Sequence, residues 1–173
     1  KLTQAQYWSA LGVRFAQYLG EKPFNVRTPF PPNCIIPPAA TDEEHAEAKH
    51  LPYCELVGCM AYPSCYTKLE IRWNISVLSR FMSNYSSKHW ELAVGVLKYG
   101  VSSREIGLLF SLGLDRHGVN VLSALADANF RKPPERSGGC SMVMMNGAAV
   151  AVHAKQHSTI ATSPTGAEPK EQL

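Results

Sequence analysis

Apolar residues recur at helical spacing near the start of the chain. The apolar positions, three or four residues apart, are Tyr7, Leu11, Phe15 and Tyr18. This spacing predicts one amphipathic helix over residues 3–19. Thr3 and Gln6 fit a capping box, in which two side chains satisfy free backbone N–H groups of the first turn. Gly20 is the expected end of this helix.

A proline-rich stretch follows this helix and predicts a linker over residues 21–41. Its prolines are Pro23, Pro29, Pro31, Pro32, Pro37 and Pro38. Proline fits neither a helix interior nor a central strand. The acidic cluster after the linker, residues 42–47, predicts a short solvated helical turn.

The middle of the chain predicts three further helices. The first covers about residues 53–62, and the second opens at Thr67 with Glu70 as a second capping-box pair. The third covers about residues 87–99, and Gly100 is expected to end it.

The periodicity changes after Gly107, where short apolar runs replace the helical pattern. The runs are residues 121–126, 142–145 and 148–152, and Asn146-Gly147 joins the last two. Asn-Gly between apolar runs predicts a tight hairpin, because both residues tolerate positive φ. Helices followed by strands predict an α+β fold or two subdomains.

Composition narrows the class of protein only slightly. Apolar residues make up 45% of the chain, enough for a core, and the net charge of +3 permits nucleic-acid contact without requiring it. The five cysteines form no C-x-x-C pair, so we expect no zinc site. No secretory leader and no membrane-length apolar run is apparent, so we expect no membrane contact and an intracellular location, cytoplasmic or nuclear, without secretion.

The carboxylates offer one candidate for chemistry. Only three aspartates exist in the sequence, and Asp127 lies at the end of an apolar strand pattern. A carboxylate there could bind a divalent cation if other acidic groups converged on it. A turn-opening role for Asp127 is the simpler alternative.

Ordered motifs then make the chain resemble copia-type retrotransposon Pol polyproteins. The central segments are residues 51–62 (LPYCELVGCMAY), 67–71 (TKLEI), 77–84 (VLSRFMSN), 88–90 (KHW), 96–99 (VLKY) and 107–110 (GLLF). They are similar to the family's P-Y-x-x-x-V-G-x-L-x-Y, T-R-P-D-I, V-L-S-R-F-M-S-N, K-H-W, V-L-R-Y and G-L-x-F. Residues 126–130 (ADANF) resemble S-D-A-D-W, and residues 159–168 (TIATSPTGAE) resemble T-V-A-L-S-T-T-E-A-E.

The resemblance implies three regions. Residues 1–50 would end the reverse transcriptase with a thumb-like helix and linker, and residues 51–104 would form a helical connection. Residues 105–173 would form a truncated RNase H-like domain, with a three-stranded antiparallel meander and the start of a helix.

The resemblance also implies a site. Asp127 and Glu168 would be RNase H catalytic residues that bind Mg²⁺, a reaction in which carboxylates hold two metal ions. Asn129 and Gly166 stand where the family motifs have acidic residues, and Pro169 follows Glu168 directly. The sequence also has no Asp-Asp pair for a polymerase. We therefore expect a catalytically inactive fragment, a pseudoenzyme, whose partner is the rest of the Pol polyprotein.

Two alternatives stay open. The chain could be a module that binds an RNA–DNA hybrid through phosphate contacts, or it could retain residual RNase H activity. The basic candidates for phosphate contact are Lys68, Arg72, Arg80, Lys88 and Arg136.

Overall fold

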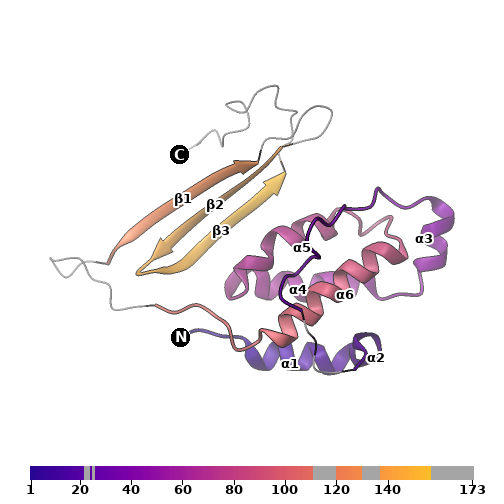
Figure 1. Ribbon diagram of the computed structural model, residues 1–173, viewed down its shortest axis with the longest axis horizontal. Helices are drawn as coiled ribbons and strands as arrows, with labels where there is room; N and C mark the ends of the chain where they lie inside the picture. The colour runs from indigo at the N-terminus through magenta and orange to yellow at the C-terminus, as the bar shows by residue number, and fades with distance from the viewer. Residues whose placement is uncertain (22–23, 25, 111–119, 130–136, 157–173) are drawn as a thin grey trace. The chain divides into compact units, whose positions relative to one another are not determined.

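The chain is α+β. A computed structural model describes residues 1–21, 24, 26–110, 120–129 and 137–156. Within these ranges it has six α-helices, one short 3-10 helix and a three-stranded antiparallel sheet (Figure 1). The chain divides into two compact units, one of residues 2–107 and one of residue 1 with residues 108–173.

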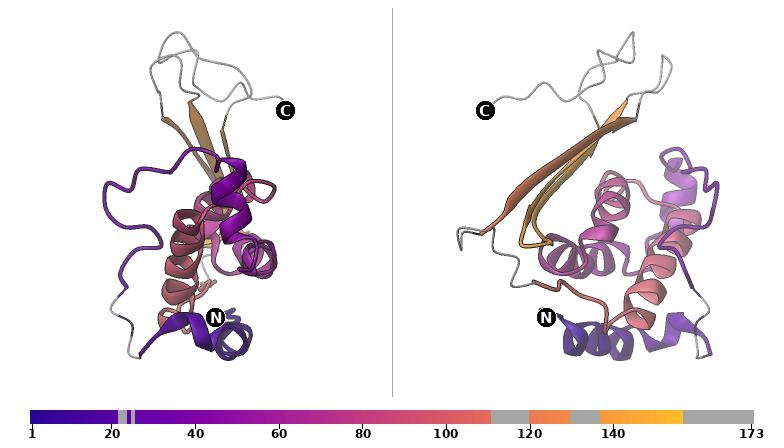
Figure 2. Two further views of the ribbon diagram at one scale, coloured as in Figure 1. Left: turned by 90° about the vertical axis from the view of Figure 1, so that its right-hand side faces the viewer. Right: turned by 60° about the vertical axis from the view of Figure 1, so that its left-hand side comes forward.

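The first unit is helical. Its elements are α1 (Ala5–Arg14), α2 (Ala16–Leu19), α3 (Asp42–Ala48), α4 (Tyr53–Tyr66), the 3-10 helix η1 (Leu69–Ile71), α5 (Arg72–Ser79) and α6 (Ser87–Ser102). Helix α6 contacts α1, α2, α3, α4 and α5, so it is the central helix of this unit (Figure 2). The core side chains repeat at helical spacing and include Trp8, Leu11, Phe15, Leu56, Met60, Ile71, Leu78, Ala93, Val96 and Leu97. Burying each large apolar side chain contributes about 1.5–3 kcal/mol.

The predicted first helix is divided in the structure. Helix α1 ends at Arg14, α2 begins at Ala16, and Phe15 lies between them as the cap of both. The N-cap of α1 is Gln4, whose side chain makes no capping bond, so the Thr3–Gln6 capping box was wrong.

The second predicted capping box was also wrong. Thr67 is the C-cap of α4, which continues past the expected end and includes Pro63. The Thr67 hydroxyl donates to the side-chain oxygen of Gln4, so Thr67 does not cap the start of a helix. The sequence pattern missed this because the partner of Thr67 lies 63 residues away.

Two other capping boxes form in the structure, and neither was predicted from the sequence. Thr41 and Glu44 cap α3, which confirms a short helix with exposed acidic residues. Ser86 and His89 cap α6. Helix α6 continues through Gly100 to Ser102, so the expected end at Gly100 was wrong.

The second unit contains the sheet. Its strands β1 (Leu122–Asn129), β2 (Gly138–Met145) and β3 (Ala148–Gln156) pair in sequence order, each antiparallel to the next. The predicted hairpin is confirmed, because Met145 pairs with Ala148 and the turn residues Asn146 and Gly147 have φ of 50° and 82°.

Two hydrogen bonds connect the same turn to Val121, the residue before β1. The Asn146 N–H donates to the Val121 carbonyl at 2.9 Å, and the Val121 N–H donates to the Asn146 side-chain oxygen at 2.9 Å. The turn therefore fixes the register of both the second hairpin strand and the first strand of the meander.

Candidate functional site

Asp127 lies on β1, as predicted, and its side chain is exposed. One of its carboxylate oxygens accepts the N–H of the next residue, Ala128, at 2.9 Å. Across the sheet at this level Asp127 pairs with Cys140, which in turn pairs with Ala154. The neighbouring strands therefore place a thiol and a methyl group, rather than carboxylates, opposite Asp127.

The described residues do not complete a magnesium site. Among them, no three or more His, Cys, Asp or Glu side chains lie close enough to hold a metal ion together. Glu168, the second expected ligand, and Pro169 lie outside the described residues, as does the expected start of a helix. A hard divalent cation such as Mg²⁺ prefers several oxygen ligands, whereas Asp127 supplies a single carboxylate.

The basic candidates that the structure describes belong to different elements or element ends. Arg72 begins α5, and the exposed Arg80 follows its last residue. Arg80 is eight positions after Arg72, which corresponds to about 12 Å along the helix axis. Lys88 is exposed in the first turn of α6, and Arg136 lies outside the described residues. Arg80 and Lys88 are therefore exposed to solvent, whereas Arg72 is half-buried.

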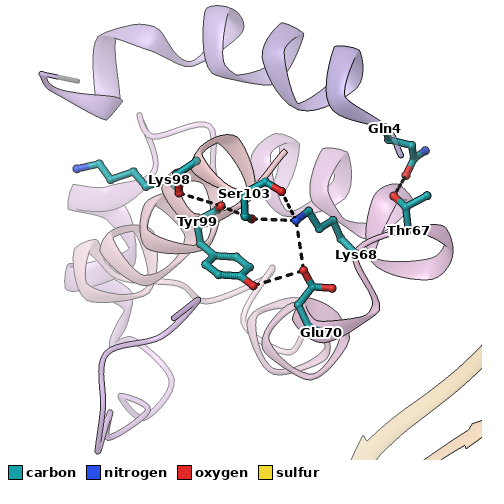
Figure 3. Close-up of polar contacts among 8 residues, drawn as sticks. Gln4, Thr67, Lys68, Glu70, Lys98, Tyr99 and Ser103 are labelled. Atoms are coloured by element: carbon teal, nitrogen blue, oxygen red, sulfur yellow. Dashed lines mark hydrogen bonds and ion pairs between the residues drawn. The ribbon is translucent and has the colours of Figure 1, made fainter. Parts of the chain in front are cut away.

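Lys68 has a structural environment that the sequence did not indicate. Its side chain is only 1% exposed, and its ammonium group donates to the Ser103 carbonyl at 2.6 Å and the Ser103 hydroxyl at 2.8 Å (Figure 3). The Glu70 carboxylate lies 3.3 Å from the same nitrogen and also accepts the Tyr99 hydroxyl at 3.4 Å. Ser103 is the C-cap of α6, so Lys68 satisfies a carbonyl at the end of that helix.

This environment changes the interpretation of Lys68. Burial lowers the pKa of Lys68, and the neighbouring Glu70 carboxylate partly offsets that effect. A buried ammonium with three partners inside the fold has no free face for a phosphate, so Lys68 holds η1 against the end of α6 instead. The Thr67-Lys68-Leu69-Glu70 sequence gave no signal of this, because Ser103 lies 35 residues away.

The helical unit has a shallow hollow and an exposed aromatic group. Tyr18, Trp90, Glu91, Val94, Gly95 and Lys98 line the hollow. Elsewhere, the Tyr62 ring lies between Tyr7 and Tyr66, with centroid separations of 5.4 and 5.2 Å, and Tyr62 and Tyr66 are exposed. Tyrosine is enriched at protein interfaces, so these rings are candidates for contact with another protein.

The comparisons with known proteins place the chain in a family. It is 31% identical over 119 residues to Secreted RxLR effector protein 161 of Plasmopara viticola, a match that covers 68% of this chain and 81% of the relative. The chain belongs to the family of this effector protein. This membership contradicts the expected intracellular location without secretion, because the relative is named as a secreted protein.

A second relative supports a retrotransposon-related origin. The chain is 28% identical over 130 residues to the retrovirus-related Pol polyprotein from transposon TNT 1-94 of Nicotiana tabacum. The match covers 74% of this chain but only 9% of the polyprotein. No family model matches the chain, and no solved structure matches it. Within the described ranges, no helix combines the length and apolarity needed to cross a bilayer.

Proposed function

We propose that the chain is a non-catalytic module descended from a copia-type retrotransposon Pol polyprotein, running from the end of the reverse transcriptase into an RNase H-like domain. The ordered motifs over residues 51–168 and the similarity to the tobacco transposon polyprotein support this origin. The helical unit would then correspond to the thumb-like and connecting region. The remainder of a Pol polyprotein would be its ancestral partner.

The topology of the sheet supports the RNase H-like part of the proposal. Strands β1, β2 and β3 form an antiparallel meander, and Asp127 lies on its first strand. This is the arrangement that the resemblance implies for the start of such a domain.

The proposed lack of catalysis is inferred from the surroundings of Asp127. Its carboxylate accepts the adjacent Ala128 N–H and faces Cys140 and Ala154 across the sheet. Two-metal hydrolysis needs carboxylates that converge on both ions, because each ion requires several oxygen ligands and charge compensation. Cys140 and Ala154, which the sheet places opposite Asp127, supply neither carboxylate oxygens nor negative charge.

A cleavage assay tests this proposal. The full chain is incubated with a labelled RNA–DNA hybrid and Mg²⁺, beside an Asp127→Asn variant that keeps the shape of the side chain. We expect no hybrid cleavage above the background of the variant. Cleavage by the wild-type chain that Asp127→Asn abolishes would overturn the proposal and establish residual RNase H activity.

Hybrid binding without cleavage is supported by the solvent exposure of Arg80 and Lys88 in the helical unit. Phosphate contacts release counterions, so such binding weakens steeply as salt rises. A filter-binding titration at several salt concentrations, with an Arg80→Gln/Lys88→Gln double variant, measures this. Binding that loses both affinity and salt dependence in the double variant supports the hybrid-binding function, and unchanged binding excludes these residues.

A secreted effector is a third candidate function, and family membership supports it. The exposed Tyr62 and Tyr66 rings would offer an aromatic surface to a protein partner. Antibody detection of the full gene product in culture medium and in cell extract of the source organism tests secretion, with an abundant intracellular enzyme as the control. Accumulation in the medium without that enzyme supports the effector function, and retention in the cells overturns it.

A further inference from the structure

Two histidines hold the segment that leads into α6. Nδ1 of His45 lies 3.0 Å from the Tyr85 carbonyl oxygen, and the Ser86 N–H donates to Nδ1 of His89 at 3.1 Å. A carbonyl only accepts and a backbone N–H only donates. Nδ1 of His45 must therefore carry a proton, whereas Nδ1 of His89 must not.

His89 is completely buried at the third position of α6. The Ser86 hydroxyl lies 2.9 Å from its Nδ1, and the Phe81 ring packs against the imidazole with centroids 4.2 Å apart. Ser86 and His89 together form the capping box of the helix. The neutral imidazole thus replaces the Glu or Gln that usually closes such a box.

Two groups on the elements around His89 favour its protonated form. Glu44 of α3 is the charged group, and its carboxylate is also held at 3.0 Å by the Thr41 N–H. The Pro37 backbone in the linker also favours the protonated ring, and the buried Nε2 of His89 has no hydrogen-bond partner among the described residues. The loop before α6 packs the uncharged Phe81 against the ring, and the linker is tied to this loop by the Ala40 N–H, which donates to the Asn84 carbonyl at 2.9 Å.

We propose that Ser86 and His89 form an acid-sensitive clasp, which fixes the start of α6 beside the linker and α3 and opens when His89 takes up a proton. A protonated Nδ1 faces the Ser86 N–H as a second donor, so the bond that closes the capping box is lost, and the ring can donate only to the Ser86 hydroxyl. The charged ring is also left in a buried site next to Phe81, where its desolvation is costly. The bond from His45 to Tyr85 survives, because its Nδ1 is already protonated.

The direction of the pH dependence follows from this geometry. Burial lowers the pKa of His89 below its ordinary value of about 6.5, and the opposing effects of the Pro37 backbone and the Glu44 charge only partly compensate. The unfolded chain therefore takes up this proton at higher pH than the folded chain. The contribution of the clasp to stability is fully present above about pH 6.5 and is lost as the pH falls toward the folded pKa.

Thermal unfolding of the full chain at pH 7.5 and at pH 5.5 tests the clasp. The variants are His89→Gln, whose side-chain oxygen accepts the Ser86 N–H without titrating, and His45→Gln as the matched control. We expect the Tm of the wild type and of His45→Gln to fall several degrees further on acidification than the Tm of His89→Gln. An equal fall in wild type and His89→Gln overturns the proposal.

A measurement on the unaltered chain keeps the test valid if His89→Gln does not fold. Nuclear magnetic resonance follows the His89 ring and the backbone amides of Ala40 and Ser86 as the pH is lowered. We expect the ring to titrate below its ordinary pKa, with both amides shifting at the same midpoint. Titration of the ring at its ordinary pKa without movement of the amides contradicts the clasp.

Discussion

Gly100 lies directly against the indole ring of Trp8, so closely that a Cβ at position 100 would overlap the ring. Trp8 is fully buried on α1, and Gly100 is inside α6 near its end. The missing side chain of Gly100 therefore lets the two helices approach. The sequence predicted Gly100 as a helix end, but its contact with Trp8 gives it a packing role.

Gly100→Ala should destabilise the helical unit, although alanine is the better helix former by about 1 kcal/mol. The overlap with Trp8 forces a shift in a packed core, which costs about 1–3 kcal/mol and exceeds the gain in propensity. Gly58→Ala in α4 is the matched control, because a Cβ there meets no atom within 4 Å. Urea unfolding should show opposite signs for the two variants, and stabilisation by both would contradict the packing.

Lys68→Met should destabilise the chain by roughly 1–3 kcal/mol, because the Ser103 carbonyl loses a charged donor in a buried site. Methionine keeps most of the apolar stem, so the loss reports mainly on the ammonium. Lys88→Met, at an exposed position, is the control and should change stability by less than about 0.5 kcal/mol. Similar effects at both positions in chemical denaturation would show that the Lys68 network contributes little.

Tyr53→Phe should weaken the chain at neutral pH and remove part of its loss of stability in alkali. The Tyr53 hydroxyl is buried and donates to the Leu78 carbonyl at 2.8 Å. Burial raises its pKa above the ordinary value of about 10, so the unfolded chain ionises first. This contribution to stability is present below about pH 10 and is lost as the pH rises toward the folded pKa.

Unfolding midpoints at pH 8 and pH 10.5 measure the Tyr53 effect. The wild type should lose more stability over this interval than Tyr53→Phe, and Tyr62→Phe, altered at an exposed ring, should behave as the wild type. Equal losses in the wild type and Tyr53→Phe would refute the role of this hydroxyl.

Gly147→Ala should weaken the sheet by about 1–2 kcal/mol, because φ at this position is 82° and alanine is strained there. Asn146→Gly tests the other half of the turn: it tolerates the positive φ but removes the side-chain oxygen that accepts the Val121 N–H. Hydrogen exchange of the β2 and β3 amides should accelerate in Gly147→Ala. In Asn146→Gly we expect the Val121 amide to lose protection first, and unchanged protection in both variants would exclude a role for the turn.

The sequence alone determined the local features of this chain. Helical spacing of Leu11, Phe15 and their neighbours indicated helices, and Asn146-Gly147 indicated the hairpin, because these signals depend on residues close together along the chain. The same reasoning placed Asp127 on a strand.

Only the tertiary structure decided which polar groups are buried and which glycine is needed for packing. Lys68 meets Ser103, Thr67 meets Gln4, and Gly100 meets Trp8 across 35, 63 and 92 residues of chain. From the sequence, a basic residue is expected to be exposed to solvent. Its burial requires an acceptor that offsets the desolvation of its charge, and that acceptor can lie far away along the chain. Such compensation exists only once the helices have packed.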